Sequence, residues 1–182
     1  VNPFVFKAVQ PLQRWLLARS PHARHLASRD DPLAELPMTT DPKFLSGHVV
    51  LVGYGRVGRH IASALSAQAV PFVVAEQNRE LVEQLRADGV PAVSGDAALP
   101  EVLVQAHIAR ARVLVVATPE TLVVRQMAAC AKALNPQIEI VVRSHNEAEA
   151  RMLEAELASK VFVGEQELAD AMSRHVLGKS SR

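Results

Sequence analysis

The chain has 182 residues, of which 49% are hydrophobic and 21% are charged, and its formal net charge is +1 at pH 7. This balance is ordinary for a globular protein long enough for one well-packed domain and some additional chain, and it gives no reason to expect a nucleic-acid partner. The single cysteine, Cys130, excludes an internal disulfide and fits a cytosolic compartment. The histidines show no metal-ligand spacing outside His22 and His25, so we expect no metal site.

The first 47 residues differ from the rest of the chain. Residues 1–19 carry an apolar face that is interrupted by Pro11 and too short to span a bilayer unaided, and every charge from Val1 to Arg29 is basic. We therefore expect the end of a membrane or interfacial helix over 1–19, with a basic amphipathic helix on a soluble partner as the alternative. Residues 20–47 are proline-rich without sustained periodicity, which predicts a linker. Because the chain does not begin with Met, we expect a piece of a longer protein.

The stretch HVVLVGYGRVG at residues 48–58 combines a buried strand pattern with a glycine-rich turn. Its glycines, Gly53, Gly55 and Gly58, have the G-x-G-x-x-G spacing, and apolar residues then recur every fourth position as on one helix face. In this motif the first glycine makes the tight turn, the second admits a pyrophosphate, and the third lets the helix pack on the strand. The phosphate then meets the helix N-terminus. The pattern predicts a nucleotide site, with a purely structural turn as the alternative.

From residue 48 onward, strands and helices alternate with short connections. The expected strands lie at 49–52, 71–76, 90–94, 113–117, 138–142 and 161–163. Gly89 should end the helix before the third strand, and Pro100 suits the first turn of the next helix. Ser144 to Glu147 indicates a capping box. The alternation predicts an α/β fold, a Rossmann-like doubly wound parallel sheet of about six strands over residues 48–178, followed by a tail at 179–182.

Ligands of such a sheet bind outside the carboxyl ends of the strands, at the point where the strand order reverses. The candidate residues at these ends are Gly53, Tyr54, Gly55, Arg56, Val57 and Gly58 after the first strand, Glu76, Gln77 and Arg79 after the second, Asp96 and Ala97 after the third, and Thr118 after the fourth.

These candidates differ in what they can do chemically. The carboxylate of Glu76 can accept hydrogen bonds from a ribose diol and repels a 2′-phosphate, which favours NAD or AMP over NADP; Arg79 weakens that preference without reversing it. Arg56 could pair with phosphate or be solvated. Asp96 could accept a hydrogen bond from the adenine amino group or cap the helix that follows. Thr118 could likewise contact the ligand or cap the helix that follows it.

The sequence lacks the groups that hydride transfer needs. Such enzymes require a substrate pocket and a positioned proton donor, usually from a second domain or long insertions. The one tyrosine, Tyr54, lies inside the glycine turn, and no Ser/His/Asp or Cys/His set converges on the predicted crevice. We therefore predict a sensor without catalytic residues. A small or truncated NAD-dependent oxidoreductase is the alternative, and a structural dimerisation domain with a vestigial site is a third possibility.

Taken together, the motifs resemble one family. GYGRVG, an acidic residue after the second strand, GDA after the third and ATPE after the fourth resemble the TrkA-N or RCK (regulator of K⁺ conductance) domain. The likeness is greatest to the cytosolic domain of Kef-type bacterial monovalent cation:proton antiporters, whose glycine turn, E-x-x-R stretch and closing segment are similar to residues 51–58, 76–79 and 161–171. The resemblance covers about residues 46–178, and NPFVF near the start is similar to the tail of such an antiporter's last membrane helix.

The resemblance implies that the named residues bind an adenine nucleotide, NAD(H) or AMP, and that the ligand gates the efflux of potassium or another monovalent cation. It further implies a homodimer and the parent antiporter's membrane transport domain as partners, at the cytoplasmic face of a bacterial inner membrane. In this family the final helix often packs on the partner subunit, and Leu168, Met172 and Val176 are the matching positions. Packing within one chain is the alternative for these three side chains.

Overall fold

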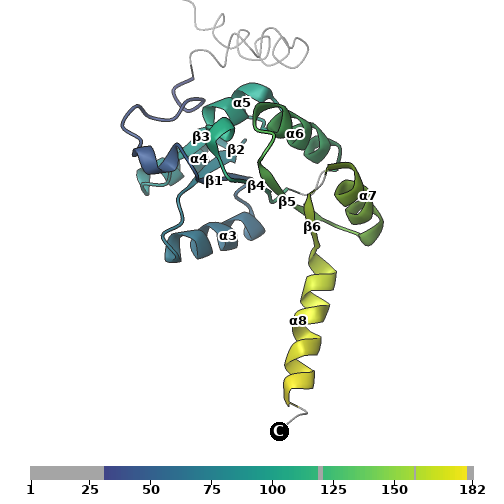
Figure 1. The fold of residues 1–182 in the computed structure, drawn as a ribbon. Coiled ribbons are helices and arrows are strands. Elements are labelled where there is room, and N and C mark those ends of the chain that lie inside the picture. Colours follow the sequence, from purple (N-terminus) through teal and green to yellow (C-terminus); the bar gives the residue numbers. More distant parts are fainter. Residues whose placement is uncertain (1–30, 119–120, 158, 180–182) are drawn as a thin grey trace, which may run out of the picture.

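The computed structural model of the chain describes residues 31–118, 121–157 and 159–179. The helix predicted at 1–19, the start of the predicted linker and most of the predicted tail lie outside the described residues. The described part contains one sheet of six parallel strands in the order β3-β2-β1-β4-β5-β6 (Figure 1). The predicted Rossmann-like α/β fold is confirmed.

All six predicted strands occur, with their ends shifted by at most two residues. The strands are β1 (Val49–Val52), β2 (Phe72–Glu76), β3 (Ala92–Ser94), β4 (Val113–Val116), β5 (Glu139–Ser144) and β6 (Lys160–Val163). The helices are α3 (Arg56–Ala67), α4 (Arg79–Ala87), α5 (Pro100–Gln105), α6 (Thr121–Leu134), α7 (Glu147–Leu157) and α8 (Gly164–Lys179), with 3₁₀ turns η1 (Pro42–Phe44) and η2 (Ile108–Arg110).

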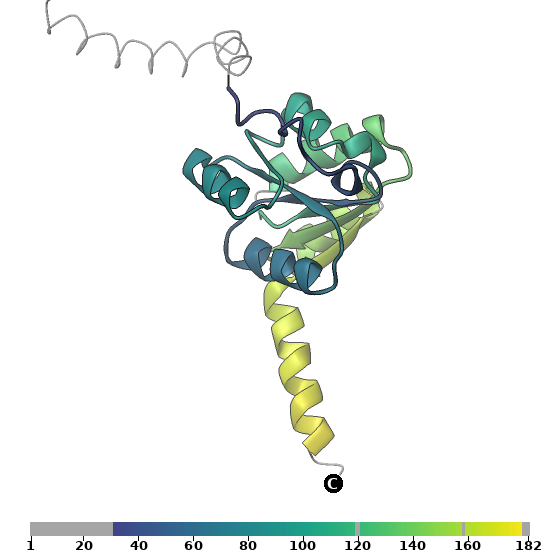
Figure 2. The same ribbon diagram turned by 90° about the vertical axis from the view of Figure 1, so that its left-hand side faces the viewer.

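The strand order reverses at β1, which pairs with β2 on one side and with β4 on the other. The helices that follow β1 and β2 cover one face of the sheet, and α5, α6 and α7 cover the other (Figures 1 and 2). Because adjacent residues of a strand point to opposite faces, Val50 packs under α5 and α6, whereas Leu51 packs under α3 and α4. The glycine turn after β1 therefore lies at the point where the helices pass from one face of the sheet to the other.

Local signals account for the ends of several helices. Asn78 caps α4, since its Oδ1 accepts a hydrogen bond from the Leu81 N–H at 3.2 Å. Gly89 ends the same helix with a φ of +78°, in the left-handed region that favours glycine. Pro100 begins α5, as predicted, because the first turn of a helix needs no proline N–H.

The predicted capping box at the start of α7 is wrong. Ser144 is the last residue of β5, and its hydroxyl donates to the Asn146 carbonyl at 3.1 Å. The cap is Asn146, whose Oδ1 accepts from the Glu149 N–H at 2.9 Å. The strand extends two residues further than the sequence pattern indicates, so the cap moves along the chain with it.

Helix α8 extends away from the sheet (Figures 1 and 2). All residues from Gly164 to Gly178 are exposed, and the side chains of Leu168, Met172 and Val176 are 61%, 62% and 62% exposed. The structure therefore does not place these three side chains in the core of their own chain.

The described part of the predicted linker, residues 31–47, lies against the domain. Leu33 packs on the apolar cluster beneath α4, and Leu36 and Phe44 pack on the cluster of the opposite face. The N–H of Gly47 donates to the Arg110 carbonyl at 2.8 Å, just before β1 begins. This segment has no strand and only the short turn η1, yet its path over the domain is fixed by contacts.

Candidate functional site

A cavity of about 340 Å³ lies at the carboxyl ends of β1, β2 and β3 and beside the start of α6. Its lining residues are Val52, Gly53, Ala75, Glu76, Gln77, Gly95, Asp96, Ala97, Thr118, Val123 and Met127. Six of the predicted site residues are among them, namely Gly53, Glu76, Gln77, Asp96, Ala97 and Thr118. The structure thus brings together residues from four separate strand ends at the place where the strand order reverses.

The three glycines of the turn face very different surroundings. A Cβ atom added to Gly58 would lie 2.0 Å from the Gly53 carbonyl oxygen, and one added to Gly53 would lie 2.6 Å from Cγ2 of Thr118. A Cβ atom added to Gly55 would meet no atom within 4 Å. Gly53 also has a φ of +87°. Packing explains the first and third glycines, whereas the space beside Gly55 is open.

The N-terminus of α3 has no side-chain cap. Gly55 is the N-cap residue, and it offers no side chain to the N–H groups of the first turn. Arg56 follows it and is exposed. On the outer side of the turn, Nε of Arg59 donates to the Tyr54 carbonyl at 3.2 Å and its guanidinium lies 5.7 Å from the centre of the Tyr54 ring. Unpaired N–H groups at a helix start favour an anion.

The carboxylate of Glu76 joins two loops at the mouth of the cavity. Its Oε2 accepts a hydrogen bond from the Tyr54 N–H at 2.7 Å, and its Oε1 accepts from the Asn78 N–H at 2.9 Å. One side chain therefore ties the glycine turn after β1 to the loop after β2. An ionised carboxylate can accept about four hydrogen bonds, so each oxygen keeps capacity for a ligand hydroxyl.

Two further polar side chains of the lining come from the loops after β3 and β4. Oδ1 of Asp96 accepts from the Ala98 N–H at 2.9 Å, whereas the N-cap residue of α5 is Leu99, so Asp96 stabilises the turn before the helix and does not cap it. Oγ1 of Thr118 is buried without a hydrogen-bond partner among the described residues. Because buried hydroxyls normally have a partner, this one marks a place where a ligand could bind.

The other predicted residues lie outside the cavity lining. Arg79 begins α4, and its guanidinium forms an ion pair with Asp31 of the preceding segment. Val57 contributes to a second, apolar cavity of about 210 Å³ on the other face of the sheet, together with Ile61 and Phe162.

Five residues of the lining, Val52, Ala75, Gly95, Val123 and Met127, were not among the predicted site residues, and two of them, Val123 and Met127, come from α6. Their spacing of four along α6 is typical of any buried helix face, so the sequence has no signal to separate them from the core.

The described residues contain no group of three or more His, Cys, Asp or Glu side chains that could hold a metal ion. None of the helices within the described ranges is long and apolar enough to cross a membrane.

Comparison with known proteins identifies the family to which this architecture belongs. The family model of the TrkA-N domain matches residues 49–164 of this chain. YbaL of Escherichia coli, which is named as a cation/proton antiporter, is 39% identical over 131 residues, covering 72% of this chain and 24% of YbaL. The crystal structure of the TrkA-N domain of the inner membrane protein YbaL superposes with a TM-score of 0.66 at 38% identity, covering 71% of this chain and 96% of that domain.

More distant structures share the fold. The C-terminal domain of Kef from Shewanella denitrificans, solved in its AMP-bound form, has a TM-score of 0.62 at 21% identity and covers 74% of this chain and 82% of that one. The GsuK channel bound to NAD has a TM-score of 0.61 at 23% identity, covering 89% of this chain and 27% of the channel chain. The chain spans about a quarter of the length of the antiporter it matches, 24% of YbaL. Since the family model covers more than half of the chain, the chain belongs to the TrkA-N domain family, as the motifs predicted.

Proposed function

We propose that this domain binds an adenine nucleotide, NAD(H) or AMP, and thereby gates cation efflux as the cytosolic regulatory domain of a monovalent cation:proton antiporter. The observation that carries the proposal is the glycine turn. Gly53 and Gly58 are required by packing, but nothing in the described chain occupies the space beside Gly55. A ligand that approaches the backbone there explains why that position also lacks a side chain.

The cavity and the adjoining start of α3 together offer each part of an adenine nucleotide a suitable partner. The uncapped N-terminus of α3 would hold phosphate, with Arg56 close by in the chain. The Glu76 carboxylate would accept from the ribose hydroxyls, and Asp96 would accept from the adenine amino group. The Thr118 hydroxyl would gain the hydrogen bond that it lacks. The AMP-bound Kef domain and the NAD-bound GsuK channel show that proteins of this fold take such ligands.

Gating requires the nucleotide to bind one arrangement of the domain better than another. The cavity is bounded by loops from four strands, and Glu76 connects two of them through the Tyr54 and Asn78 N–H groups. A ligand hydroxyl at Glu76 would therefore act on both loops at once. A tenfold preference for one arrangement corresponds to about 1.4 kcal/mol, which is within the ordinary range of coupling between sites.

We further propose that the domain forms a homodimer through α8 and the open face of the sheet, at the cytoplasmic face of a bacterial inner membrane and next to the antiporter's transport domain. Leu168 and Met172 of α8 are more than half exposed. The apolar cavity lined by Val57, Ile61 and Phe162 lies beside α3, over strands β4, β5 and β6 of the same sheet face. A helix of a second copy would bury both apolar surfaces.

The composition of the nucleotide cavity supports a binding role over a catalytic one. Within the described part of the chain, its lining contains Glu76 and Asp96 but no His, Lys, Tyr or Cys side chain. Hydride transfer to a carbonyl needs a proton donor at the reacting atoms. An oxidoreductase, the alternative, would therefore have to obtain that donor from elsewhere. Reproducible oxidation of NADH with carbonyl substrates, abolished by a Gly55 substitution, would establish the enzyme instead.

The direct test is isothermal titration calorimetry of the purified domain with NADH, NAD, AMP and ATP. We expect at least one of them to bind, and we expect Gly55→Ala to weaken that binding about tenfold or more, because the methyl group would enter the space assigned to phosphate. The backbone at Gly55 has a φ of −75°, so alanine is tolerated there.

Gly164→Ala is the matched control, since its added Cβ likewise meets no atom within 4 Å but lies at the start of α8. It should leave the affinity unchanged. Absence of heat with all four nucleotides would contradict the proposal and favour a vestigial site.

A further inference from the structure

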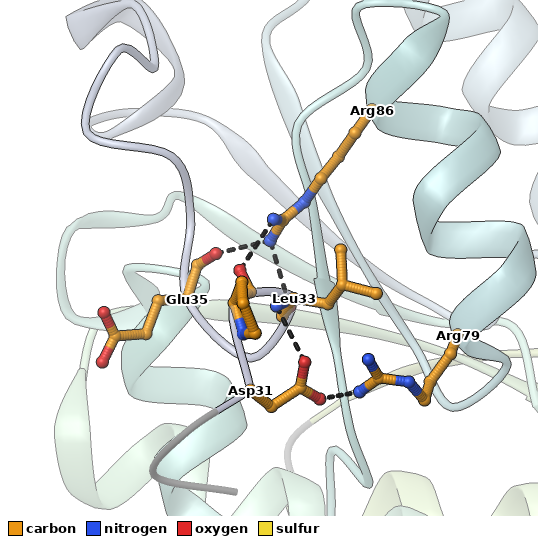
Figure 3. A network of polar contacts seen from close by, with 6 residues as sticks. Asp31, Leu33, Glu35, Arg79 and Arg86 are labelled. Atoms are coloured by element: carbon orange, nitrogen blue, oxygen red, sulfur yellow. Dashed lines mark hydrogen bonds and ion pairs between the residues drawn. The ribbon is translucent and has the colours of Figure 1, made fainter.

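The segment at residues 31–36, which we term the strap, is fixed along the outer edge of the sheet. The Leu33 carbonyl accepts a hydrogen bond from the Ser94 N–H of β3 at 2.7 Å. The Arg86 guanidinium donates to the carbonyls of Pro32 at 2.9 Å, Leu33 at 3.0 Å and Glu35 (Figure 3). Its Nε donates to the Ala92 carbonyl at 2.8 Å. One arginine thus holds the strap against both α4 and β3.

The strap places Asp31 against Arg79. Oδ1 of Asp31 accepts from the Leu33 N–H at 2.9 Å, and Oδ2 forms the ion pair with Nη1 of Arg79 (Figure 3). The Asp31 side chain is 16% exposed and that of Arg79 is 53% exposed. Because the backbone of its own turn orients the carboxylate, Asp31 is a prepared partner for Arg79 and not a freely moving surface charge.

The ion pair changes the electrostatics at the ribose end of the cavity. Among the described residues, the lining of the cavity contains the carboxylates of Glu76 and Asp96 and no cationic side chain. Arg79 follows Glu76 by three residues, at the first position of α4. In folds of this type a ribose 2′-phosphate is accommodated by an arginine near the end of the second strand. Arg79 is in the sequence position to serve that purpose, but its guanidinium is paired with Asp31.

We propose that Asp31 is a specificity-determining residue, which holds the Arg79 guanidinium away from the ribose so that the cavity selects nucleotides whose ribose hydroxyls carry no phosphate. This inference rests on the proposed nucleotide-binding function. Asp31 lies before residues 49–164, which the family model matches. Selection among nucleotides therefore depends in part on a segment outside the nucleotide-binding domain itself.

The test compares AMP with adenosine 2′,5′-bisphosphate, which differs from AMP only by the 2′-phosphate, in calorimetric titrations at low ionic strength. Asp31→Asn keeps the oxygen that accepts from Leu33 but removes the charge. We expect it to tighten binding of the bisphosphate by about three- to tenfold, because Arg79 is released, and to leave the AMP affinity unchanged. The gain should shrink as salt is added, since Arg79 is partly exposed.

Four further variants make the result specific. Glu35→Gln is the matched control: it removes the same charge from the strap, and its carboxylate points away from Arg79 (Figure 3), so it should give no gain. Arg79→Gln and the double variant Asp31→Asn/Arg79→Gln should also give none. Asp31→Ser, whose hydroxyl can likewise accept from Leu33, should repeat the Asp31→Asn result and serves if that variant is unstable.

An unchanged ratio of the two affinities in Asp31→Asn and Asp31→Ser, with AMP still bound, would overturn the role of Asp31 alone. A gain that persists in the double variant would also overturn it, because the effect would then not pass through Arg79. If the unaltered protein binds neither AMP nor NADH, the proposed function fails and the inference fails with it.

Discussion

The two halves of the sheet differ in how far the chain itself completes them. The strands β1, β2 and β3 have helices on both faces, and the strap covers their outer edge. The strands β4, β5 and β6 are covered by α6 and α7 on one face, and the other face, next to α3, holds an apolar cavity lined by Val115, Val141 and Phe162. The first half is suited to hold a small ligand without help, and the second is suited to bind another surface.

The largest expected effect is at the packed centre of the first half. Gly58→Ala should lower the free energy of unfolding by about 2–4 kcal/mol, because its Cβ would lie 2.0 Å from the Gly53 carbonyl and force β1 and α3 apart. Urea unfolding measures this loss. Gly55→Ala is the control within the same turn and should cost less than about 1 kcal/mol. Equal losses in the two variants would contradict the different packing of the two glycines.

In the second half, we expect a substitution to change self-association and not the free energy of unfolding. Leu168→Asp combined with Met172→Asp should leave the unfolding of the monomer within about 0.5 kcal/mol of the original, because both side chains are exposed. The same change should weaken self-association by about tenfold or more, since it places charge in the proposed dimer contact. Sedimentation equilibrium measures the dissociation constant.

Arg174→Asp supplies the control for that experiment. It also introduces an aspartate into α8, but on the side of the helix opposite Met172, and it should leave association unchanged. A chain that stays monomeric at all concentrations without any substitution would contradict the dimer.

The contrast between the halves also shows what a sequence can reveal. The strands and the glycine turn follow from local patterns, because an apolar run such as 49–52 and a glycine at a fixed spacing carry their structural reason with them. The strap does not, since its position depends on Arg86 meeting three carbonyls more than fifty residues earlier in the chain.

The same distinction applies to the site residues. Glu76 could be identified from its distance to the glycine turn, but its two hydrogen bonds to backbone N–H groups could not. Nor could the pairing of Arg79 with Asp31, because an ion pair between distant segments leaves no periodic pattern. The error at Ser144 has a related cause: β5 is lengthened by its neighbour β6, and the pairing of Ser144 with Val163 is a tertiary contact.

A smaller effect is expected at the link between the loops of the first half. Glu76→Gln replaces one accepting oxygen by an NH₂ group, so the N–H of Tyr54 or of Asn78 loses its partner. We expect nucleotide affinity to fall by about 1–2 kcal/mol and the rejection of NADPH to relax. Calorimetry with NADH and NADPH measures both changes. Glu80→Gln, in the first turn of α4, is the charge-matched control. Unchanged affinities for both ligands would remove Glu76 from the site.

The smallest expected effect concerns His48, which precedes β1 at the end of the sheet opposite the nucleotide cavity. His48 is fully buried, its Nε2 lies 2.9 Å from the Ala106 carbonyl, and its Nδ1 has no partner among the described residues. A carbonyl only accepts, so Nε2 carries the proton and Nδ1 is bare. Burial lowers the pKa of this imidazole below its ordinary value, despite the hydrogen bond to Ala106.

A lowered pKa in the folded state means that the unfolded chain binds the additional proton more readily. The contribution of His48 to stability is therefore fully present above the unfolded pKa of about 6.5, and it is lost as the pH falls from there toward the folded pKa, with a slope of at most about 1.4 kcal/mol per pH unit. Urea unfolding between about pH 7.5 and 5 should show this decline. His48→Gln keeps an N–H donor for Ala106 but cannot titrate, so its decline should be shallower, whereas His60→Gln, at an exposed position of α3, should follow the original curve. If the free energy of unfolding of His48→Gln falls as steeply with pH as that of the unaltered protein, the acid sensitivity arises from groups other than His48.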